Sequence, residues 1–228
     1  MAQMKSIRQI FLEHDTDKNA QFHNYSRQYD RLLSNYRGQR IQYLEIGVLG
    51  GASLRAMREV FSSAGLILGL DIDPNAQQSE ERARNIRVEI GDATNRAFID
   101  NITAQYGHFD VIVDDGSHRN VDMIQSFEML FPLLRDNGVY IVEDTVCYKS
   151  PSHNVAGFPD ILSYFSKYVG YLNQWRFDSD TGIKDHCVDP FKIEKKTVDV
   201  FESSIDKIEY GVSYVAIHKK VRKHWVSG

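Results

Sequence analysis

The sequence contains little cysteine and no long apolar run. Its 228 residues include two cysteines, Cys147 and Cys187, whose spacing is not that of a metal site and which are too few for a disulfide framework. The N-terminus lacks the apolar core of a signal peptide. No stretch approaches the ~20 apolar residues that a membrane-spanning helix needs. We therefore expect a cytoplasmic protein with no membrane partner.

An excess of positive charge is also missing. The chain has 27 Lys and Arg against 31 Asp and Glu, a net charge of −4. This balance gives no general attraction to nucleic acid, so nucleic acid is not expected as a partner. A hydrophobic content of 42% is ordinary for a globular protein. Because there are no internal repeats and no Pro/Gly-rich linkers, we expect a single domain over residues 1–228.

Short apolar runs, each ending in or next to an acidic residue, predict the strands of a sheet. Segments of helical length separate the runs, as is typical of parallel strands covered on both faces. We therefore expect an α/β fold with a doubly wound, Rossmann-like, mainly parallel sheet. Its ligand crevice would lie beyond the carboxyl ends of the strands. The runs are residues 41–46, 66–71, 109–114 and 138–143, with a weaker one at 86–90.

The remaining periodic segments predict helices and a different kind of edge. Residues 53–61 and 122–134 have apolar residues at helical spacing, the second with Asn137-Gly138 as a stop signal. Residues 1–39 are expected to form an N-terminal helical segment. Residues 198–202 and 212–217 alternate between apolar and polar, which predicts an antiparallel C-terminal edge to the sheet.

The segment before that edge is rich in aromatic residues. Tyr164, Tyr168, Tyr171 and Trp175 recur at helical spacing. We interpret them as a helix that packs on the core or on a partner subunit, with an aromatic wall against the substrate as the alternative. Residues 148–190 match no known motif, and we predict that they form the substrate lid.

A glycine-rich loop follows the first predicted strand. It reads Glu45-Ile46-Gly47-Val48-Leu49-Gly50-Gly51-Ala52-Ser53. Glycines at such a place let the backbone approach a ligand closely. The spacing differs from the G-x-G-x-x-G of dinucleotide-binding proteins. A tight turn without a ligand is the alternative.

Acidic residues at the following strand ends favour a ligand. Asp71 ends the second strand, where a carboxylate can accept hydrogen bonds from two ribose hydroxyls. Asp92 follows the strand at 86–90 and lies where a nucleobase amine is expected. A pyrophosphate fits so acidic a pocket poorly, whereas a cationic nucleoside without phosphate fits it well.

This pattern resembles the S-adenosylmethionine site of class I methyltransferases over roughly residues 40–145. The resemblance implies that Glu45, Gly47 and Ser53 line the methionine side of the cofactor. It assigns Asp71 to the ribose and Asp92 to the adenine. It adds Gly51, Asp114 and Tyr25 to the cofactor-binding candidates.

A second group of carboxylates follows the later strands. Asp115 and His118 belong to Asp114-Asp115-Gly116-Ser117-His118, and Glu143-Asp144 ends the next strand. If these strands are neighbours, Asp115, Glu143 and Asp144 converge at one rim and repel one another unless a cation compensates. An all-oxygen ligand set favours Mg²⁺. His118 would lie beside the ion with a pKa range suited to a general base.

The alternative for these residues is structural. Asp115 and Ser117 would cap the following helix, because Asp and Ser are good N-caps. Glu143 and Asp144 would form surface ion pairs. This alternative leaves unexplained why an acidic pair ends another strand at the same rim, and we favour the metal site.

D-D-G-S-H followed by E-D-T also resembles the magnesium-dependent sugar O-methyltransferases of macrolide biosynthesis, with the rhamnosyl O-methyltransferases and cephalosporin-hydroxylase-like proteins grouped with them. The resemblance implies that Asp115, Glu143 and Asp144 hold the metal and that His118 is the base. The run from Thr16 to Tyr29 is similar to a family segment beside the cofactor pocket, which makes Lys18 and Tyr25 secondary candidates.

The expected function is metal-dependent transfer of a methyl group from S-adenosylmethionine to a hydroxyl of a small molecule, a sugar or vicinal-oxygen group of a natural product. Two alternatives stay open. One is a catechol-type O-methyltransferase, and the other is a nicotinamide-dependent oxidoreductase on the same fold class. Whether the chain forms a homo-oligomer is also open.

Overall fold

The computed structural model describes residues 4–19, 21–170, 172, 177–178, 182–183 and 200–220. The chain divides into two compact units, Met1–Ser117 and His118–Gly228, and each is described by itself. The expectation of one domain stays a prediction. Within the described residues, no helix combines the length and the apolar character needed to cross a membrane.

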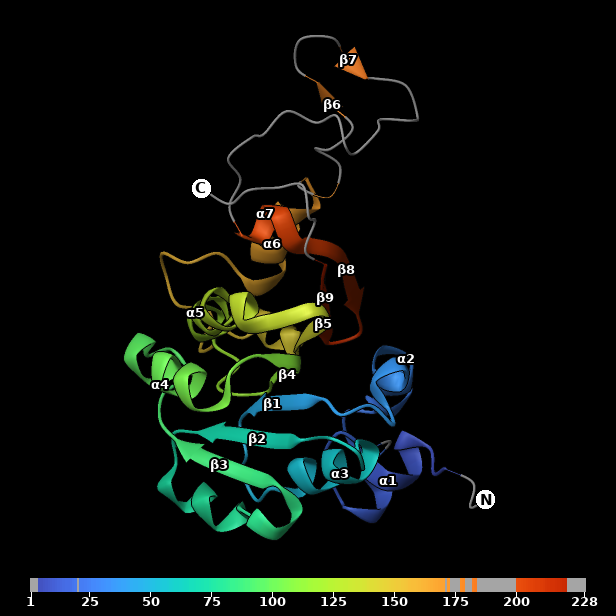
Figure 1. Ribbon diagram of the computed structural model, residues 1–228. Coiled ribbons are helices and arrows are strands. Elements are labelled where there is room, and N and C mark those ends of the chain that lie inside the picture. The colour runs from blue at the N-terminus through green and yellow to red at the C-terminus, as the bar shows by residue number, and fades with distance from the viewer. Residues whose placement is uncertain are drawn as a thin grey trace. The chain divides into compact units, whose positions relative to one another are not determined.

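The first unit is built on four parallel strands (Figure 1). The strand order is β3-β2-β1-β4. All four were expected from the apolar runs, and their interiors are buried because helices and turns cover them. The strands are β1 (Gln42–Ile46), β2 (Leu66–Asp71), β3 (Ile86–Ile90) and β4 (Phe109–Asp114).

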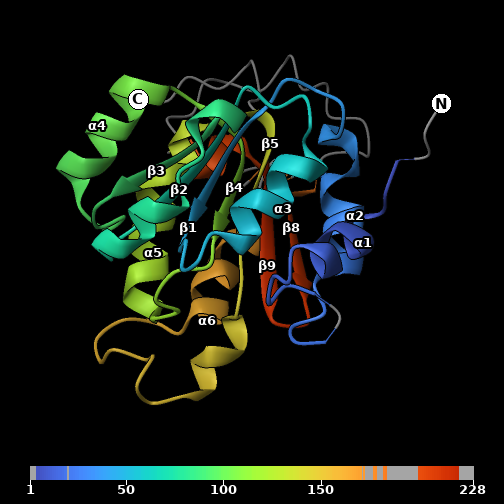
Figure 2. The same ribbon diagram turned by 90° about the horizontal axis from the view of Figure 1, so that it is seen from below.

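Helices α1 (Ile7–Glu13) and α2 (Ser26–Leu33) lie in the expected N-terminal helical segment and pack against each other (Figure 2). Ser6 and Gln9 form a capping box that starts α1. Helix α3 (Ala52–Val60) confirms the predicted helix after the glycine loop, and α4 (Arg96–Tyr106) precedes β4. Short 3-10 turns are η1 (Ser34–Tyr36), η2 (Pro74–Ser79) and η3 (Arg82–Arg84).

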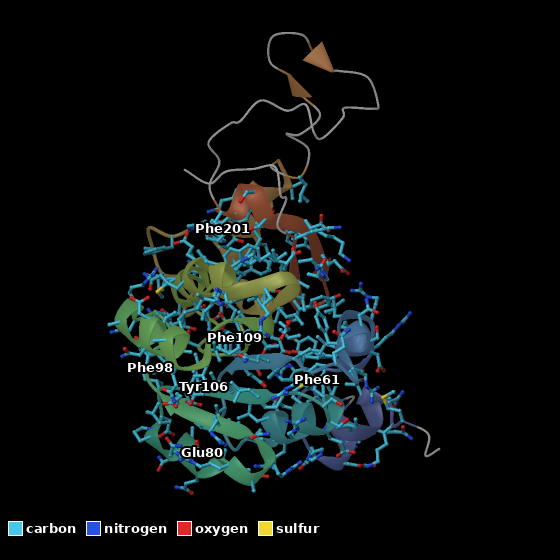
Figure 3. The ribbon with its side chains drawn as sticks, in the orientation of Figure 1. Phe61, Glu80, Phe98, Tyr106, Phe109 and Phe201 are labelled. Atoms are coloured by element: carbon cyan, nitrogen blue, oxygen red, sulfur yellow. The ribbon has the colours of Figure 1, made fainter. Side chains whose placement is uncertain are left out.

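The core of this unit lies between the helices and the strands. Phe61 follows α3 and Phe109 begins β4, and both side chains are fully buried (Figure 3). The Phe61 ring packs on Tyr43 of β1, with 5.8 Å between ring centroids. Aromatic packing of this kind fixes α3, and therefore the glycine loop before it, against the strands.

The second unit contains the expected antiparallel edge. Strand β5 (Leu134–Val142) pairs with β9 (Tyr214–Lys219), and β9 pairs with β8 (Ile205–Gly211), which lies beside it in Figure 2. A two-residue turn at Val212-Ser213 joins β8 to β9, and Ser213 adopts a left-handed conformation with φ 63°. The mainly parallel α/β class with an antiparallel C-terminal edge is thus confirmed.

Two details of the sequence prediction are wrong. Residues 198–202 were expected to be a strand, but the described part of this range belongs to the short helix α7 (Val200–Ser204). The side-chain hydroxyls of Ser203 and Ser204 donate to the Val200 carbonyl. Asn137-Gly138 does not end a helix. Helix α5 (Asn120–Leu130) ends earlier, at η4 (Phe131–Leu133), because Pro132 cannot continue it. Asn137 instead lies inside β5.

The aromatic segment contributes to the core. Tyr164, Phe165 and Tyr168 of α6 (Ile161–Ser166) and η6 (Lys167–Val169) are buried around Phe127. This confirms the packing interpretation for these residues. Tyr171 and Trp175 lie outside the described residues, and so do residues 179–181 and 184–190 of the predicted lid at 148–190. The remaining elements are η5 (Thr145–Lys149), β6 (Phe177–Asp178) and β7 (Gly182–Ile183).

Candidate active site

The glycines of the loop after β1 have structural reasons of their own. Gly47 adopts φ +89°, and a Cβ there would lie 2.1 Å from the backbone oxygen of Asp115. Gly51 adopts φ +72° at the N-cap of α3, where a Cβ would meet Ser79 at 2.5 Å. Both positions therefore require glycine for the fold, as the tight-turn alternative supposes. The loop glycines alone do not prove a ligand.

Glu45 lies beneath this loop and is fully buried. Its Oε2 accepts hydrogen bonds from Tyr43 Oη at 2.8 Å and from Ser53 Oγ at 3.0 Å. Burial raises the pKa of the Glu45 carboxyl, whereas the ammonium of Lys18 opposes this shift. Glu45 and Ser53, both predicted to line the methionine side of the cofactor, are thus hydrogen-bonded to each other. Of the two, Ser53 is partly exposed and Glu45 is not.

Asp71 holds the glycine loop in shape. Its Oδ2 accepts hydrogen bonds from the backbone N–H groups of Val48 and Leu49, at 2.8 and 3.1 Å, and its Oδ1 accepts one from Asp73 at 2.9 Å. A carboxylate has further lone pairs for ribose hydroxyls. Asp92 is exposed after β3, and its Oδ1 accepts hydrogen bonds from Thr94.

The end of β4 carries the first part of the predicted metal site. Asp114 is buried, and Asp115 is partly buried. The backbone N–H of Asp115 donates a hydrogen bond to the Ile46 carbonyl at 3.0 Å. The Asp115 carboxylate forms an ion pair with Lys18. Tyr25, another cofactor candidate, is buried and stacks on His23, with 5.7 Å between ring centroids.

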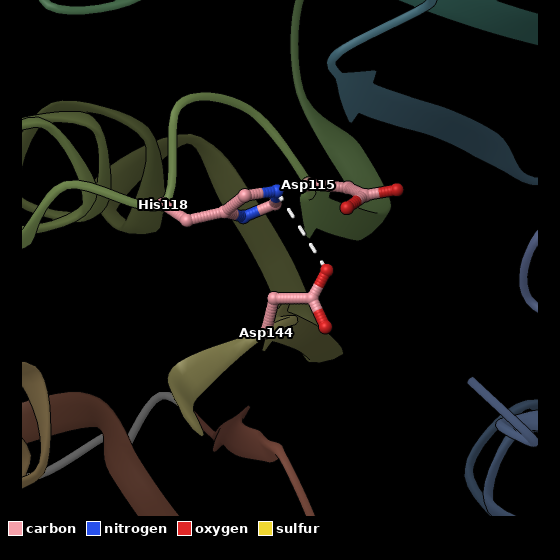
Figure 4. A group of neighbouring side chains, drawn as sticks. All are labelled: Asp115, His118 and Asp144. Atoms are coloured by element: carbon pink, nitrogen blue, oxygen red, sulfur yellow. Dashed lines mark ion pairs between the residues drawn. The ribbon is translucent and has the colours of Figure 1, made fainter. Parts of the chain in front are cut away.

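The second unit carries the other predicted site residues. Nε2 of His118 lies 3.6 Å from Oδ2 of Asp144, the ion pair drawn dashed in Figure 4. Both residues adopt left-handed backbone conformations, with φ 57° for His118 and 50° for Asp144. Such conformations are uncommon for residues other than glycine, although Asp and His adopt them more readily than most. Glu143, next to Asp144, is almost completely buried.

The structure differs from the structural alternative at two places. Arg119 is the N-cap residue of α5, so neither Asp115 nor Ser117 occupies that position. Glu143 is 1% exposed and therefore forms no surface ion pair.

The structure shows one residue near this site that the sequence analysis missed. The buried Asn120 accepts the N–H of Val155 at 2.8 Å and donates to the Pro159 carbonyl at 3.1 Å. Its own backbone N–H is donated to the His153 carbonyl at 2.9 Å. Asn120 thus fastens the segment after η5 to the start of α5, two residues from His118. An asparagine at a helix start carries no distinctive signal, because it is common there as a cap.

Comparison with known proteins finds similarity to methyltransferases. Residues 44–145 match the family model described as a methyltransferase domain. This range contains the glycine loop, the acidic strand ends and Asp144. The resemblance stated from the sequence is confirmed over residues 44–145, which are similar to a methyltransferase domain.

Relatives of this chain include O-methyltransferases. The chain is 40% identical over 136 residues to the Mycinamicin VI 2''-O-methyltransferase of Micromonospora griseorubida, covering 57% of this chain and 33% of that protein. It is 37% identical over 136 residues to the demethylmacrocin O-methyltransferase of Streptomyces fradiae, with the same two shares. The chain therefore spans about a third of the length of these relatives.

A solved structure shares the fold over nearly the whole chain. The MycE methyltransferase of the mycinamycin biosynthetic pathway, in complex with Mg and SAH, has a TM-score of 0.82 and 26% sequence identity. The match covers 98% of this chain and 57% of that one. A further complex of MycE, with Mg, SAH and mycinamycin VI, matches with a TM-score of 0.80.

Proposed function

We propose that this protein is a metal-dependent O-methyltransferase that moves a methyl group from S-adenosylmethionine to a hydroxyl of a small molecule. The observation that carries the proposal is the pairing of His118 with Asp144 at 3.6 Å, in a chain whose residues 44–145 are similar to a methyltransferase domain. The acceptor we propose is a sugar or another vicinal-oxygen group of a natural product. The names of two relatives, a mycinamicin VI 2''-O-methyltransferase and a demethylmacrocin O-methyltransferase, support this choice.

The proposed metal ligands are Asp115, Glu143 and Asp144. Asp115, His118 and Asp144 carry atoms of the kinds that hold an ion, and carboxylate oxygens suit Mg²⁺. Only Gly116 and Ser117 separate Asp115 from His118, so the chain itself limits their Cα separation to at most about 11 Å. The carboxylate oxygens of Asp115, Glu143 and Asp144 therefore suit a divalent ion chemically.

The proposed cofactor site is the rim of the first unit. Gly47, Gly51 and Ser53 would face the methionine part of S-adenosylmethionine, and Glu45 would support Ser53 from below. Asp71 would bind the ribose, and Asp92 the adenine. Asp114 and Tyr25 would complete the pocket.

In the proposed reaction, an acceptor oxygen attacks the sulfonium methyl group. The new O–C bond forms as the S–C bond breaks, and His118 Nε2 takes the hydroxyl proton. The Asp144 carboxylate beside that nitrogen stabilises the charge that the imidazole gains. A bound divalent ion would act as a Lewis acid toward the acceptor oxygen.

The activity assay described below also distinguishes two alternative functions. A catechol-type enzyme would use the same residues on an aromatic diol. A nicotinamide-dependent oxidoreductase is disfavoured because the loop lacks G-x-G-x-x-G. The cytoplasmic location stays a prediction from the sequence, and whether the chain forms a homo-oligomer stays open.

The test is a methyl-transfer assay with purified protein, sugar-bearing and catechol acceptors, and controlled Mg²⁺. We expect EDTA to abolish transfer and Mg²⁺ to restore it. His118→Ala should lower the transfer rate by ~10²-fold or more, with little change in S-adenosylmethionine affinity measured by calorimetry. His218→Ala is the matched control, because His218 pairs with Glu209 on the β8–β9 hairpin, away from Asp144 in the chain.

Three results would contradict parts of this proposal. Transfer that is indifferent to EDTA would remove the metal from the reaction. Full activity of His118→Ala would remove the base. Binding of NAD but not of S-adenosylmethionine would replace the proposed function with the oxidoreductase.

A further inference from the structure

Lys18 is a buried cation in the first unit, next to the Asp115 carboxylate. It lies in the turn between α1 and α2, and its side chain is only 1% exposed. Its Nζ forms an ion pair with Asp115 Oδ2 and lies 3.4 Å from Glu45 Oε1. The methyl-transfer chemistry described above assigns this lysine no role.

The turn that carries Lys18 is fixed by its own backbone. The Lys18 carbonyl accepts the N–H of Tyr25 at 3.1 Å, and the Thr16 carbonyl accepts the N–H of Asn19 at 3.0 Å. The ammonium is therefore presented from a defined place. A long side chain held in this way loses less freedom when it forms an ion pair than a surface lysine does.

The partners of Lys18 are fixed as well. Glu45 is fully buried, and its second oxygen already accepts hydrogen bonds from Tyr43 and Ser53. The Asp115 backbone is fastened to the end of β1 through the Ile46 carbonyl. With its backbone fixed, the orientation of the Asp115 carboxylate depends on what binds its oxygens.

We propose that Lys18 is a positioning residue that holds one carboxylate oxygen of Asp115 and so orients this side chain for a divalent cation. Glu45 is the counter-charge that keeps the ammonium in place. This inference rests on the proposed function, because it takes Asp115 to be a metal ligand. Groups that hydrogen-bond metal ligands in this way set ligand orientation, and their loss typically costs metal affinity.

Two consequences of removing the ammonium oppose each other. The nearby positive charge that repels the ion disappears, which by itself favours metal binding. The donor that orients Asp115 is also lost, which disfavours it. If Lys18 acts through orientation, the second effect is the larger.

The experiment measures the Kd of Mn²⁺ by electron paramagnetic resonance, with no cofactor or acceptor present. We expect Lys18→Met to raise this Kd by ~10-fold or more, within the 10–100-fold typical of such supporting residues. Because this change leaves Glu45 buried without a cation, Lys18→Met combined with Glu45→Gln provides a variant that folds if the single one does not. The same increase in Kd is expected for the pair.

Lys219→Met is the matched control for loss of a buried ammonium. Lys219 contacts the Phe131 and Pro132 carbonyls rather than carboxylates, so its loss should change the denaturation midpoint but leave the Mn²⁺ Kd within about threefold. An unchanged or lower Kd in the Lys18 variants would overturn the inference while leaving the proposed function intact. If the wild-type protein does not bind Mn²⁺, both are overturned.

Discussion

Two lysine side chains are almost completely buried among the described residues, and their surroundings differ. Lys18, at 1% exposure, faces the carboxylates of Glu45 and Asp115. Lys219, at 6%, donates to the carbonyls of Phe131 and Pro132 and lies over the Phe131 ring. Carbonyl dipoles and a ring compensate a charge less completely than two carboxylates do. Burial accordingly lowers the pKa of Lys219 from 10.5 to about 8.

Charged groups therefore pair with one another around Lys18, whereas apolar packing dominates around Lys219. Around Lys18, the buried polar groups are joined into an ionic cluster that consists of Lys18, Glu45, Asp115 and Ser53. Around Lys219, stability comes from aromatic rings, and the lysine closes the end of a helix. Substitutions in the two regions should therefore differ in what they change and by how much.

The largest effect is expected in the aromatic region. Phe127 is fully buried, with ring centroids 4.9 Å from Phe165 and 5.1 Å from Phe131. Phe127→Ala should lower the free energy of unfolding by ~3–5 kcal/mol, because a buried ring leaves a cavity that the surroundings only partly fill. Urea denaturation measures this loss. Phe158→Ala, at a residue that is 44% exposed, should cost at most ~0.5 kcal/mol. Equal losses would contradict the assignment of this core.

A smaller effect is expected in the ionic cluster. Ser53 Oγ donates to the buried Glu45 carboxylate at 3.0 Å. Ser53→Ala should cost ~1.5–3 kcal/mol of unfolding free energy, the range for a hydrogen bond to a charged group. Ser163 also donates its hydroxyl to a carboxylate, that of Asp160, but at an exposed position. If Ser163→Ala proves as costly as Ser53→Ala, burial does not distinguish the two bonds.

A third effect concerns pH and Lys219. Its pKa is about 8 in the folded chain and 10.5 ordinarily, so between these values the unfolded chain binds more protons than the folded one. The free energy of unfolding should therefore rise with pH across pH 8 to 10.5 relative to Lys219→Met. Denaturation of both proteins at several pH values tests this. Parallel pH profiles would show that Lys219 titrates normally.

The parallel strands were readable from the sequence because each is a short apolar run between polar turns. The acidic residues at or next to the ends of β1, β2 and β4 could be located for the same reason. The error at 198–202 has a physical cause, since an alternating five-residue run fits a strand and a short helix equally well. Asn137-Gly138 was wrongly predicted to end the helix, because Asn and Gly are common after helix C-termini. Pro132 had already ended α5.

The contacts of the candidate site were less accessible. Lys18 was a secondary candidate through a family resemblance, but its ion pair with Asp115 joins residues far apart in the chain. No local pattern encodes such a contact, because only the folded strands bring the two together. Asn120 was missed for a related reason. Its hydrogen-bond partners lie in an irregular segment, where no sequence periodicity predicts which residues meet.

The left-handed conformations of His118 and Asp144 have a consequence for protein engineering. At both positions, glycine or asparagine would adopt this left-handed backbone conformation with less strain. A screen that selects for heat resistance alone would therefore reward replacement of the two residues proposed to do the chemistry. Directed evolution of this scaffold should hold both positions constant and seek stability in the aromatic core instead.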